Sequence, residues 1–471
     1  SPAADAGEPP WLVSFASQSG QAEQLAWRAA GQLQAAGMRV QVTPMARLDG
    51  GTLQEARRAL FVVSTFGDGE APDSARAFER KVLAQAQALP ELGYAMLALG
   101  DRQYERFCGF ARRVEQWLGE QGAAALFPCI DVDGEDARAL QRWQAQLSTL
   151  TGVEVEVAVE AAPHGLLQDW TLQERTLLNP GSQGGEIWQV TLLPPAGAGW
   201  QAGDILQVAP RHAAEEVTAV LAAAGLDADA PVHVDGLELR VHDAAARRVL
   251  PPIDQLQAVQ DAAQWLDQLP PLPTREYSIA SCLADGHVQL VVRLVQGDDG
   301  RPGIGSGWLS RHAAMGGGVP ARVRRNAGFH RHVDAPAMIL IGNGTGIAGL
   351  RSLLREADGA GQHGHWLLFG ERQQACDALY AQEIIDWQQQ GHLARVDQAW
   401  SRDGDTRMYV QDLLRAASAE LRHWIADGSC VYVCGSLQGM AQGVDEVLRE
   451  TLGDDAVDAL LADGRYRRDV Y

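Results

Sequence analysis

The chain has 471 residues, 46% hydrophobic and 21% charged, enough for about two to four domains with separate hydrophobic cores. Its 39 basic and 60 acidic residues give a net charge of −21, which argues against nucleic-acid binding because phosphate contacts need clustered Lys and Arg. An acidic surface favours basic partners, although solubility alone explains it equally well. No hydrophobic run reaches the roughly 20 residues that span a bilayer, and no secretory signal opens the chain, so we expect a cytoplasmic protein.

Residues 1–10 are polar, rich in Pro and Gly, and do not begin with Met, which predicts a tether. They leave open an upstream segment, such as a membrane anchor. The six cysteines form no CxxC pair and no zinc spacing, so we expect reduced thiols without disulfides or a structural metal. The twelve histidines show no metal or triad arrangement, and the pairs His330/His332 and His363/His365 are interpreted as strand alternation.

Residues 11–150 have the pattern of an open α/β sheet. Short apolar runs at residues 11–15, 59–63 and 94–99 each precede a Gly-containing loop, as buried parallel strands do. A helical period over residues 21–36 ends at a glycine. Because such sheets bind ligands at the carboxyl ends of their strands, the loops after these runs are the candidate sites.

The rest of the chain divides into three further parts. Residues 151–167 are interpreted as a linker and hinge. Residues 168–334 alternate in hydrophobicity between Pro-rich turns, which predicts an antiparallel barrel with a small helical insertion near residues 213–266. In residues 335–471 apolar runs again precede glycines, which predicts a second α/β domain of the Rossmann type.

Three loops of the first domain carry the residues that a flat, phosphorylated heterocycle needs. The segment SQSGQAE, residues 17–23, offers hydroxyls and helix N-terminal amides to a phosphate, and its lack of Lys excludes a Walker A loop. Ser17 and Ser19 as simple helix caps are the alternative. The loops at residues 64–70 and 100–107 each add flexible amides and an exposed aromatic ring.

These loops resemble the FMN-binding loops of the flavodoxin-like domain of diflavin reductases, most closely those of sulfite reductase flavoprotein subunits. The resemblance implies that Phe66 and Tyr104 flank the flavin ring, with a core role for Phe66 as the alternative. It implies further FMN contacts from the loop residues Ser17, Gln18, Ser19, Gln21, Ser64, Thr65, Gly67, Gly100, Asp101 and Phe107. The acidic residues Asp131, Asp133, Glu135 and Asp136 form either a solvated loop or a docking patch for a basic acceptor.

The middle region is similar to the FAD-binding barrel of the ferredoxin-NADP reductase superfamily. The similarity rests on Arg275, Tyr277 and Ser278 in the segment REYS and on the Gly-rich turn that follows. Arg275 and the turn amides suit a pyrophosphate. The resemblance implies that Tyr277 packs on the flavin, that Ser278 bonds near its reactive N5 and that the turn contacts the pyrophosphate through Gly303, Gly305 and Ser306.

The last domain carries the elements of an NADPH site. The segment GNGTGIA, residues 342–348, stands between an apolar run and a helical segment, the context of a dinucleotide loop, although a tight structural turn is the alternative. Its expected contacts are Gly344, Thr345 and Gly346, and Asn343 replaces the Pro that is usual in the family. A likeness to the family's 2′-phosphate clamp implies NADPH selection by Ser401, Arg402, Arg407, Tyr409 and Gln411, with solvated arginines as the alternative.

The resemblance implies a hydride-transfer site made of Ser278, Cys434, Asp469 and Tyr471. Cys434 lies in a Cys-Gly-Ser segment where the family has Cys-Gly-Asp. The terminal Tyr471 would stack on FAD and move aside for the nicotinamide.

We therefore expect a flavodoxin-like domain, an FAD-binding barrel and an NADP-binding domain that pass electrons from NADPH through FAD and FMN to a one-electron acceptor such as a sulfite reductase haemoprotein. Three alternatives stay open. The chain is the cytoplasmic part of a membrane-anchored ferric-siderophore reductase that acts on a ferric chelate, it binds flavin without turnover, or it retains FAD alone.

Overall fold

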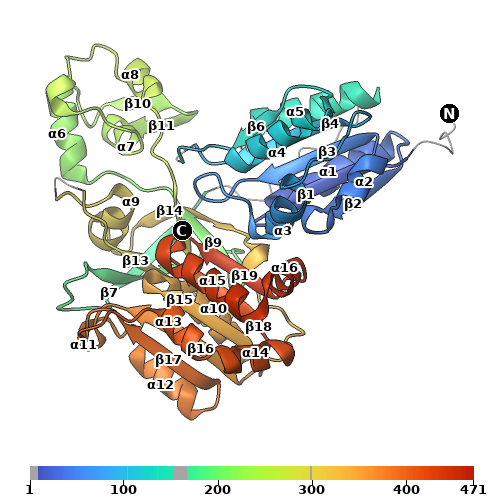
Figure 1. The fold of residues 1–471 in the computed structure, drawn as a ribbon. Helices are drawn as coiled ribbons and strands as arrows, with labels where there is room; N and C mark the ends of the chain where they lie inside the picture. The colour runs from blue at the N-terminus through green and yellow to red at the C-terminus, as the bar shows by residue number, and fades with distance from the viewer. Residues whose placement is uncertain (1–8, 103, 135, 153–166, 298–299) are drawn as a thin grey trace.

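The computed structural model describes residues 9–102, 104–134, 136–152, 167–297 and 300–471. Three large sheets organise these residues, one in each of the three expected domains, and a small two-stranded sheet lies in the insertion (Figure 1). Most of the expected tether, most of the expected linker and Glu135 lie outside the described residues.

The first sheet is parallel, with strand order β2-β1-β3-β4-β5 and β6 beside β4, so the predicted flavodoxin-like fold is confirmed. Alternate residues of its central strand face opposite layers. Leu60 and Val62 pack under α1 and α5, whereas Phe61 and Val63 pack under α2, α3 and α4. The strands are β1 (Trp11–Ala16), β2 (Val40–Pro44), β3 (Arg58–Ser64), β4 (Gly93–Gly100), β5 (Ala124–Ala125) and β6 (Ile130–Asp133). The helices are α1 (Gln21–Ala35), α2 (Gly50–Glu55), α3 (Arg76–Phe78), α4 (Gly109–Glu120) and α5 (Ala137–Thr151).

The second sheet is the predicted antiparallel barrel, with strand order β12-β9-β14-β7-β8-β13. A single bridge between Ile279 and Leu290 joins its two end strands. The insertion contains helices, as expected, and also the hairpin β10-β11, which was not predicted. The strands are β7 (Gln168–Leu177), β8 (Ile187–Leu193), β9 (Ile205–Val208), β10 (Pro231–Val234), β11 (Leu237–Arg240), β12 (Arg275–Ser278), β13 (Val288–Arg293) and β14 (Gly318–Arg324). The helices are α6 (Ala214–Ala224), α7 (Val241–Ala245), α8 (Ala262–Gln268) and α9 (Ile304–Gly307).

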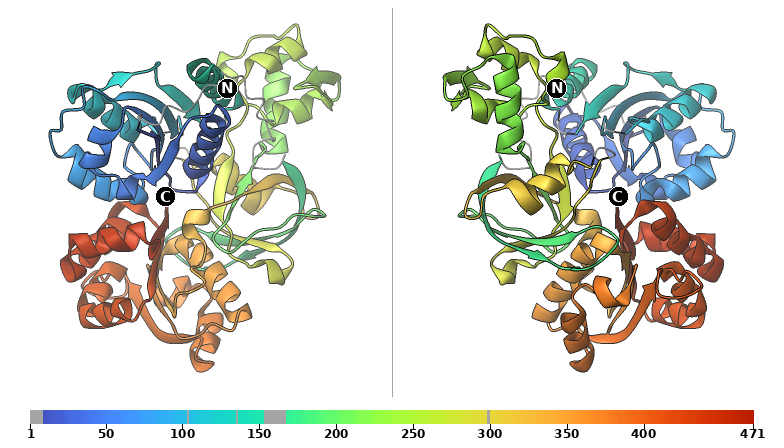
Figure 2. Two further views of the ribbon diagram at one scale, coloured as in Figure 1. Left: turned by 90° about the vertical axis from the view of Figure 1, so that its right-hand side faces the viewer. Right: turned by 90° about the vertical axis from the view of Figure 1, so that its left-hand side faces the viewer.

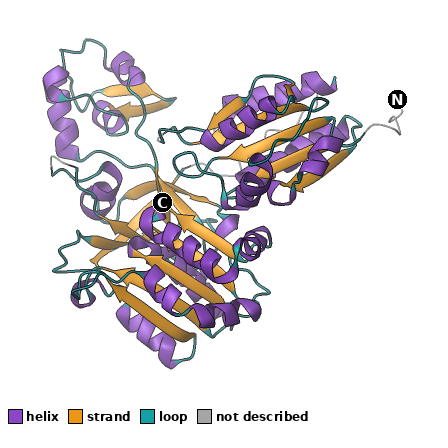
Figure 3. Cartoon of the chain, viewed as in Figure 1, coloured by secondary structure: helices purple, strands orange, loops and turns teal. Residues whose placement is uncertain are grey.

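The third sheet is parallel, with strand order β17-β16-β15-β18-β19, and helices cover both of its faces (Figure 3). Met338 and Leu340 pack on the side of α10 and α12, and Ile339 and Ile341 pack on the side of α13 to α16. The strands are β15 (Met338–Asn343), β16 (His365–Glu371), β17 (Leu393–Trp400), β18 (Cys430–Gly435) and β19 (Tyr466–Val470). The helices are α10 (Ile347–Gly359), α11 (Gln374–Asp377), α12 (Ala381–Gln389), α13 (Val410–Ala416), α14 (Ser418–Ala426), α15 (Gln442–Leu452) and α16 (Asp454–Ala462).

The carboxyl terminus lies where the three parts meet, between the first α/β domain and the last (Figure 2). Strand β19 places it there as the edge strand of the third sheet. The prediction of strand alternation for the histidine pairs was wrong. His330 and His332 lie outside the strands, and His363 precedes the strand that begins at His365.

Candidate active site

One cavity of about 480 Å³ lies at this junction and is lined by all three parts. It brings together the predicted site residues Gln18, Ser19, Gln21, Ser64, Thr65, Phe66, Gly67, Gly100, Asp101, Tyr104, Phe107, Tyr277, Ser278, Thr345, Asp469 and Tyr471. The predicted residues outside its lining are Ser17, Arg275, Gly303, Gly305, Ser306, Gly344, Gly346, Ser401, Arg402, Arg407, Tyr409, Gln411 and Cys434.

The loop after β1 is organised around Gly20. This residue, not a serine, is the N-cap of α1, and its φ of +95° favours glycine. Ser17 Oγ accepts a hydrogen bond of 2.9 Å from the Gly20 amide. The side chain of Gln18 joins two distant segments, since its Oε1 accepts from Asp73 N at 3.1 Å and its Nε2 donates to Arg468 O at 3.3 Å.

The loops after β3 and β4 hold the two aromatic rings expected to flank FMN. Phe66 and Glu70 exchange backbone hydrogen bonds of 2.9 Å, which closes the second loop. Tyr104 is 43% exposed. Phe66 is half-buried against the apolar cluster of the last domain. This packing supports the alternative interpretation, a core role for the ring. The roles of both rings stay predictions.

The barrel contributes Tyr277 and Ser278 from β12. Gly305 of α9 packs against this strand, because a Cβ at that position would lie 2.6 Å from Arg275 Cγ and 3.0 Å from the Tyr277 hydroxyl. Burial raises the pKa of Tyr277 to about 12, so the phenol is neutral at physiological pH. Ser306 Oγ accepts a hydrogen bond from Val295 N at 3.1 Å, which fixes the turn that begins α9.

Two predicted site residues contact the carboxylate of a third, Asp469. Ser278 Oγ donates to Asp469 Oδ2 at 2.6 Å, and Cys434 Sγ lies 3.8 Å from the same oxygen. Burial raises the pKa of Asp469, and the bond from Ser278 opposes this shift. Burial also raises the pKa of Cys434 well above its ordinary value, so the sulfur is a neutral thiol and not a nucleophilic thiolate.

The Gly-rich loop between β15 and α10 packs directly on β18. A Cβ on Gly346 would overlap the carbonyl oxygen of Cys434, so glycine is required for this approach. Asn343 Oδ1 accepts from Ser436 N at 2.9 Å. This bond between the Asn343 side chain and the Ser436 backbone ties the loop to β18.

Tyr471 is held at the cavity by its backbone and its hydroxyl. Its N–H donates to Gly435 O, and its carbonyl accepts from Leu437 N, both at 3.0 Å. The hydroxyls of Tyr471 and Thr345 are 2.6 Å apart. Tyr471 as a whole residue is 56% exposed, and both its backbone and its hydroxyl are held by hydrogen bonds.

The residues of the expected 2′-phosphate clamp follow β17. Arg402 and Arg407 are exposed, and neither forms an ion pair with any residue that the structure describes. The Oε1 atom of Gln411 is buried and lacks a hydrogen-bond partner among the described residues. Two exposed cations without an ion pair among the described residues suit an anionic ligand, and the unsatisfied Gln411 oxygen suits a polar one.

Sequence reasoning missed four arginines that line the cavity, Arg106, Arg293, Arg324 and Arg468. Arg468 is the most buried of them, and its Cζ lies 5.7 Å from the centroid of Phe66. Its Nε donates to Asp73 Oδ2 at 2.6 Å, and its Nη2 donates to Asp73 Oδ1. Although burial lowers it, the charge of Asp73 raises the pKa of Arg468 above its ordinary value. The only signal in the sequence is its place beside Asp469.

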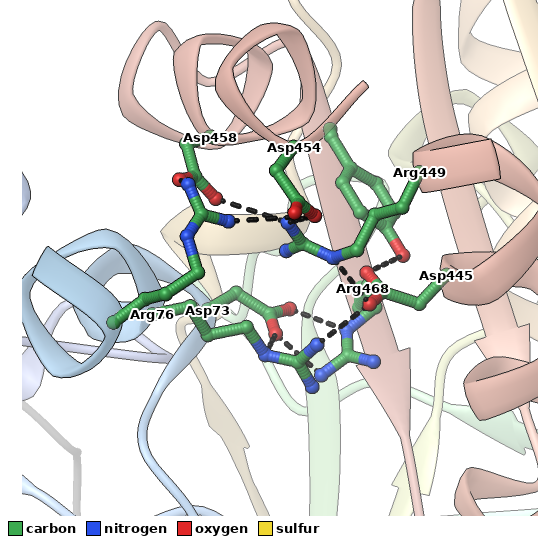
Figure 4. Close-up of polar contacts among 9 residues, drawn as sticks. Asp73, Arg76, Asp445, Arg449, Asp454, Asp458 and Arg468 are labelled. Carbon is green, nitrogen blue, oxygen red and sulfur yellow. Dashed lines mark hydrogen bonds and ion pairs between the residues drawn. The ribbon is translucent and has the colours of Figure 1, made fainter. Parts of the chain in front are cut away.

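A wider set of charges surrounds this ion pair at the boundary between the first and last domains (Figure 4). The cations of the first domain are Arg76, Arg80 and Lys81, and the carboxylates of α15 and α16 are Asp445, Asp454, Asp455 and Asp458. Arg76 Nη1 lies 3.1 Å from Asp445 Oδ2, and Lys81 Nζ lies 3.2 Å from Asp455 Oδ1. Arg449, from the last domain, pairs with three of the four carboxylates. The boundary is therefore electrostatically complementary.

The cavity and its margins fit flavin and nucleotide groups. The volume is within the range of about 300–1,000 Å³ typical of ligand pockets, and aromatic residues from all three domains line it. Thr65 Oγ1 is buried without a hydrogen-bond partner among the described residues, so a polar ligand atom would satisfy it. Packing against the Cys434 carbonyl requires glycine at position 346, which supports the alternative of a tight structural turn, and the contact of this loop with a pyrophosphate stays a prediction.

Two protein families match the chain. The flavodoxin family matches residues 13–144, and the oxidoreductase NAD-binding domain family matches residues 340–446. Over 98% of its length the chain is 31% identical to the sulfite reductase (NADPH) flavoprotein alpha-component of Yersinia enterocolitica, of which it covers 89%. The proteins of the same name from Vibrio vulnificus and Bacillus subtilis are 30% and 29% identical over 98% of the chain, which covers 87% and 89% of them.

In the part of the chain that the structure describes, no helix combines the length and the apolar character needed to cross a bilayer.

Proposed function

Because the chain belongs to the family of sulfite reductase (NADPH) flavoprotein alpha-components, it is an NADPH-dependent diflavin oxidoreductase that uses FMN and FAD, and we propose that its electron acceptor is a haemoprotein. The name of the relatives supports a sulfite reductase haemoprotein as that acceptor. No observation favours a ferric chelate.

The haemoprotein acceptor is supported by the relatives' name, and the structural observation that supports electron transfer between the two flavins is the shared cavity. Thr65 and Tyr104 enter it from the loops with FMN-type sequence, and Tyr277 and Tyr471 enter it from the elements with FAD-type sequence. When bound, FAD accepts a hydride from NADPH and FMN carries single electrons, which is chemistry that side chains do not supply. What the chain supplies is proximity, since one cavity collects the residues of both sites.

We assign the protein's own part in hydride transfer to the group around Asp469. The carboxyl group of Asp469 accepts a hydrogen bond from the Ser278 hydroxyl at 2.6 Å, and its ionised form places a negative charge beside Cys434. A fixed negative charge stabilises positive charge that develops on a nearby substrate ring. The aromatic side chain of Tyr471 covers this region, and its displacement from Thr345 would admit the nicotinamide.

We assign FMN binding to the three loops at the carboxyl ends of β1, β3 and β4. Amides at the start of α1 suit the phosphate, and the buried hydroxyl of Thr65 suits a polar edge of the ring. Arg402 and Arg407 are assigned to the 2′-phosphate of NADPH, because both cations are exposed and unpaired among the described residues.

The test compares acceptors under NADPH. The purified chain is loaded with both flavins, released flavins are quantified, and reduction of a sulfite reductase haemoprotein, cytochrome c and a ferric siderophore is followed anaerobically. We expect one FMN and one FAD per chain and the highest kcat/KM with the sulfite reductase haemoprotein. Protein loaded with FAD alone is the control and should not reduce the haemoprotein. Preferential reduction of the siderophore, or failure to retain FMN, would refute the proposal.

A further inference from the structure

A cluster of metal-ligand side chains lies in the last domain, apart from the cavity. Asp358 belongs to the last turn of α10, His363 to the connection that follows, and His392 immediately precedes β17. None of the three lines the cavity. Their positions in the sequence are too far apart to form a recognisable metal motif, so only the fold brings them together.

His392 is held rigidly with one ring nitrogen directed into the cluster. Its side chain is fully buried, and its ring contacts those of His365 and Trp387 edge to face, with centroid distances of 5.1 and 5.6 Å. Its Nε2 lies 2.9 Å from the carbonyl oxygen of Leu354, which accepts a hydrogen bond and therefore assigns the proton to Nε2. A carbonyl partner on the second nitrogen is the usual arrangement for a metal-binding imidazole. The lone pair of Nδ1 consequently faces the cluster.

Two further atoms that can ligate a metal lie near this nitrogen. The Nδ1 atoms of His363 and His392 are 3.1 Å apart, and Asp358 Oδ1 lies 3.7 Å from the first and 4.0 Å from the second. In a tetrahedral zinc site with bonds of about 2.0–2.1 Å, ligand atoms are separated by roughly 3.3 Å. The observed distances lie on both sides of this value. Small rotations of the two exposed side chains, Asp358 and His363, would equalise them.

The charge of α10 adds an independent reason for a cation here. Asp358 places a carboxylate in the last turn, where the helix macrodipole is already negative, and this turn contains no basic residue. A divalent ion at Asp358 would neutralise both the carboxylate and the negative end of the helix macrodipole. Two imidazoles and one carboxylate favour zinc and similar first-row transition metals over magnesium or calcium, which prefer oxygen ligands alone.

We propose that Asp358, His363 and His392 bind one divalent transition-metal ion of the zinc class, with water as the remaining ligand. The bound ion joins the carboxyl end of α10 to the start of β17. The opposite ends of these two elements carry the Gly-rich loop and the segment of Ser401, so the ion stabilises the frame that positions both NADPH-binding segments. The alternative occupant is a proton shared between the two Nδ1 atoms.

The test uses the chelator-treated, flavin-loaded protein without an affinity tag. Zinc chloride is titrated by calorimetry, and thermal unfolding is recorded with and without zinc. We expect one zinc ion per chain and a higher Tm in its presence, because a ligand that binds only the folded state stabilises it. The variants His363→Ala and Asp358→Asn alter exposed side chains and should each weaken zinc binding at least tenfold.

His423→Ala is the matched control, since His423 is exposed and pairs with Asp427 at 3.2 Å. It should bind zinc like the wild type. Absence of zinc uptake by the wild type would assign the cluster to a shared proton and overturn the proposal. Equal affinity in the wild type and His363→Ala would overturn it as well. Neither readout depends on NADPH oxidation, so the proposed function stands or falls separately.

Discussion

Arg468 of β19 and Asp73 of the first domain form a bidentate ion pair that crosses the boundary between the two α/β domains, with Nε donating to Oδ2 at 2.6 Å. Arg468 precedes Asp469, whose carboxylate binds Ser278. Gln18 reinforces the same junction from the loop expected to hold the FMN phosphate. One short strand thus connects the docking of the first domain to the geometry of the hydride site.

The two members of this pair should differ in their response to substitution. Asp73 has a second partner, because Arg76 Nε lies 3.2 Å from its Oδ1, whereas Asp73 is the only ion-pair partner of Arg468 among the described residues. Asp73→Leu leaves a buried guanidinium unpaired, which costs about 3–5 kcal/mol. Arg468→Met leaves Asp73 with Arg76 and should cost less.

Stopped-flow measurement of flavin reduction after mixing with NADPH, together with thermal unfolding, checks this order. Electron transfer to FMN should slow more in Asp73→Leu than in Arg468→Met, and released-flavin analysis controls for cofactor loss. The reverse order would show that the ion pair does not control docking.

The exposed ion pairs of Arg80 and Lys81 predict that docking of the first domain on the last depends on salt. Arg80 and Lys81 are 35% and 55% exposed in their side chains, so salt screens their pairs with the acidic helices. Electron transfer to FMN should fall as KCl rises, and the double variant Arg80→Gln/Lys81→Gln should have a smaller salt dependence. Arg57→Gln is the control, because Arg57 pairs with Glu91 within the first domain. An unchanged salt dependence in the double variant would contradict the interpretation of this boundary.

The strands that contain a run of apolar residues could be predicted from the sequence. Strand β19 could not, because it contains no such run. The runs that form β1, β3, β4, β15, β16 and β18 are apolar because both faces of those strands are covered. β19 has the sequence YRRDV instead. It is a strand because its backbone pairs in parallel with β18. Its buried Arg468 is matched by a carboxylate 395 residues away, which no local pattern indicates.

The candidate sites could likewise be predicted where they depend on local sequence motifs, and not where they depend on contacts between distant residues. The Gly-containing loops were recognisable because backbone approach to a ligand needs particular residue types at fixed spacing. Arg293 was missed because its partner is far away in the sequence. Its Nη2 atom lies 2.8 Å from Oε1 of Glu371, on a distant strand. His363 and His392 were missed as a pair because they meet only after α10 and β17 have packed.

Gly346 should tolerate no side chain. In Gly346→Ala the new Cβ would overlap the carbonyl oxygen of Cys434, which cannot move without disturbing β18. We expect a loss of about 1–3 kcal/mol in the free energy of unfolding and weaker NADPH binding. Gly359→Ala, at the end of α10, meets nothing within 4 Å and should be neutral or stabilising by up to about 1 kcal/mol. Chemical denaturation and NADPH titration check both, and equal stability of the two variants would contradict the argument.

The group around Asp469 should impose a pH dependence on FAD reduction by NADPH. Burial raises the pKa of this carboxyl, and the carboxylate is the form above that pKa, so the rate should fall as pH decreases toward it. Asp469→Asn should be slower by about 10²-fold or more and lack this inflection. Ser278→Ala removes a bond that lowers the pKa, so its inflection should move to higher pH. Pre-steady-state rates over the pH range check all three forms, and a wild-type inflection retained in Asp469→Asn would assign it to another group.

Arg402 and Arg407 should determine the preference for NADPH over NADH. Both are exposed and unpaired among the described residues, so they can form charge-assisted bonds with a 2′-phosphate without first breaking an ion pair. Each such bond contributes about 1.5–3 kcal/mol, so Arg402→Gln/Arg407→Gln should lower the ratio of kcat/KM values for the two coenzymes by about 10²- to 10⁴-fold. Arg415→Gln is the control, because Arg415 is also exposed but already pairs with Glu450 at 3.1 Å. The loss should lie in kcat/KM for NADPH, while the value for NADH stays constant. A parallel fall for both coenzymes would instead indicate general damage to the domain.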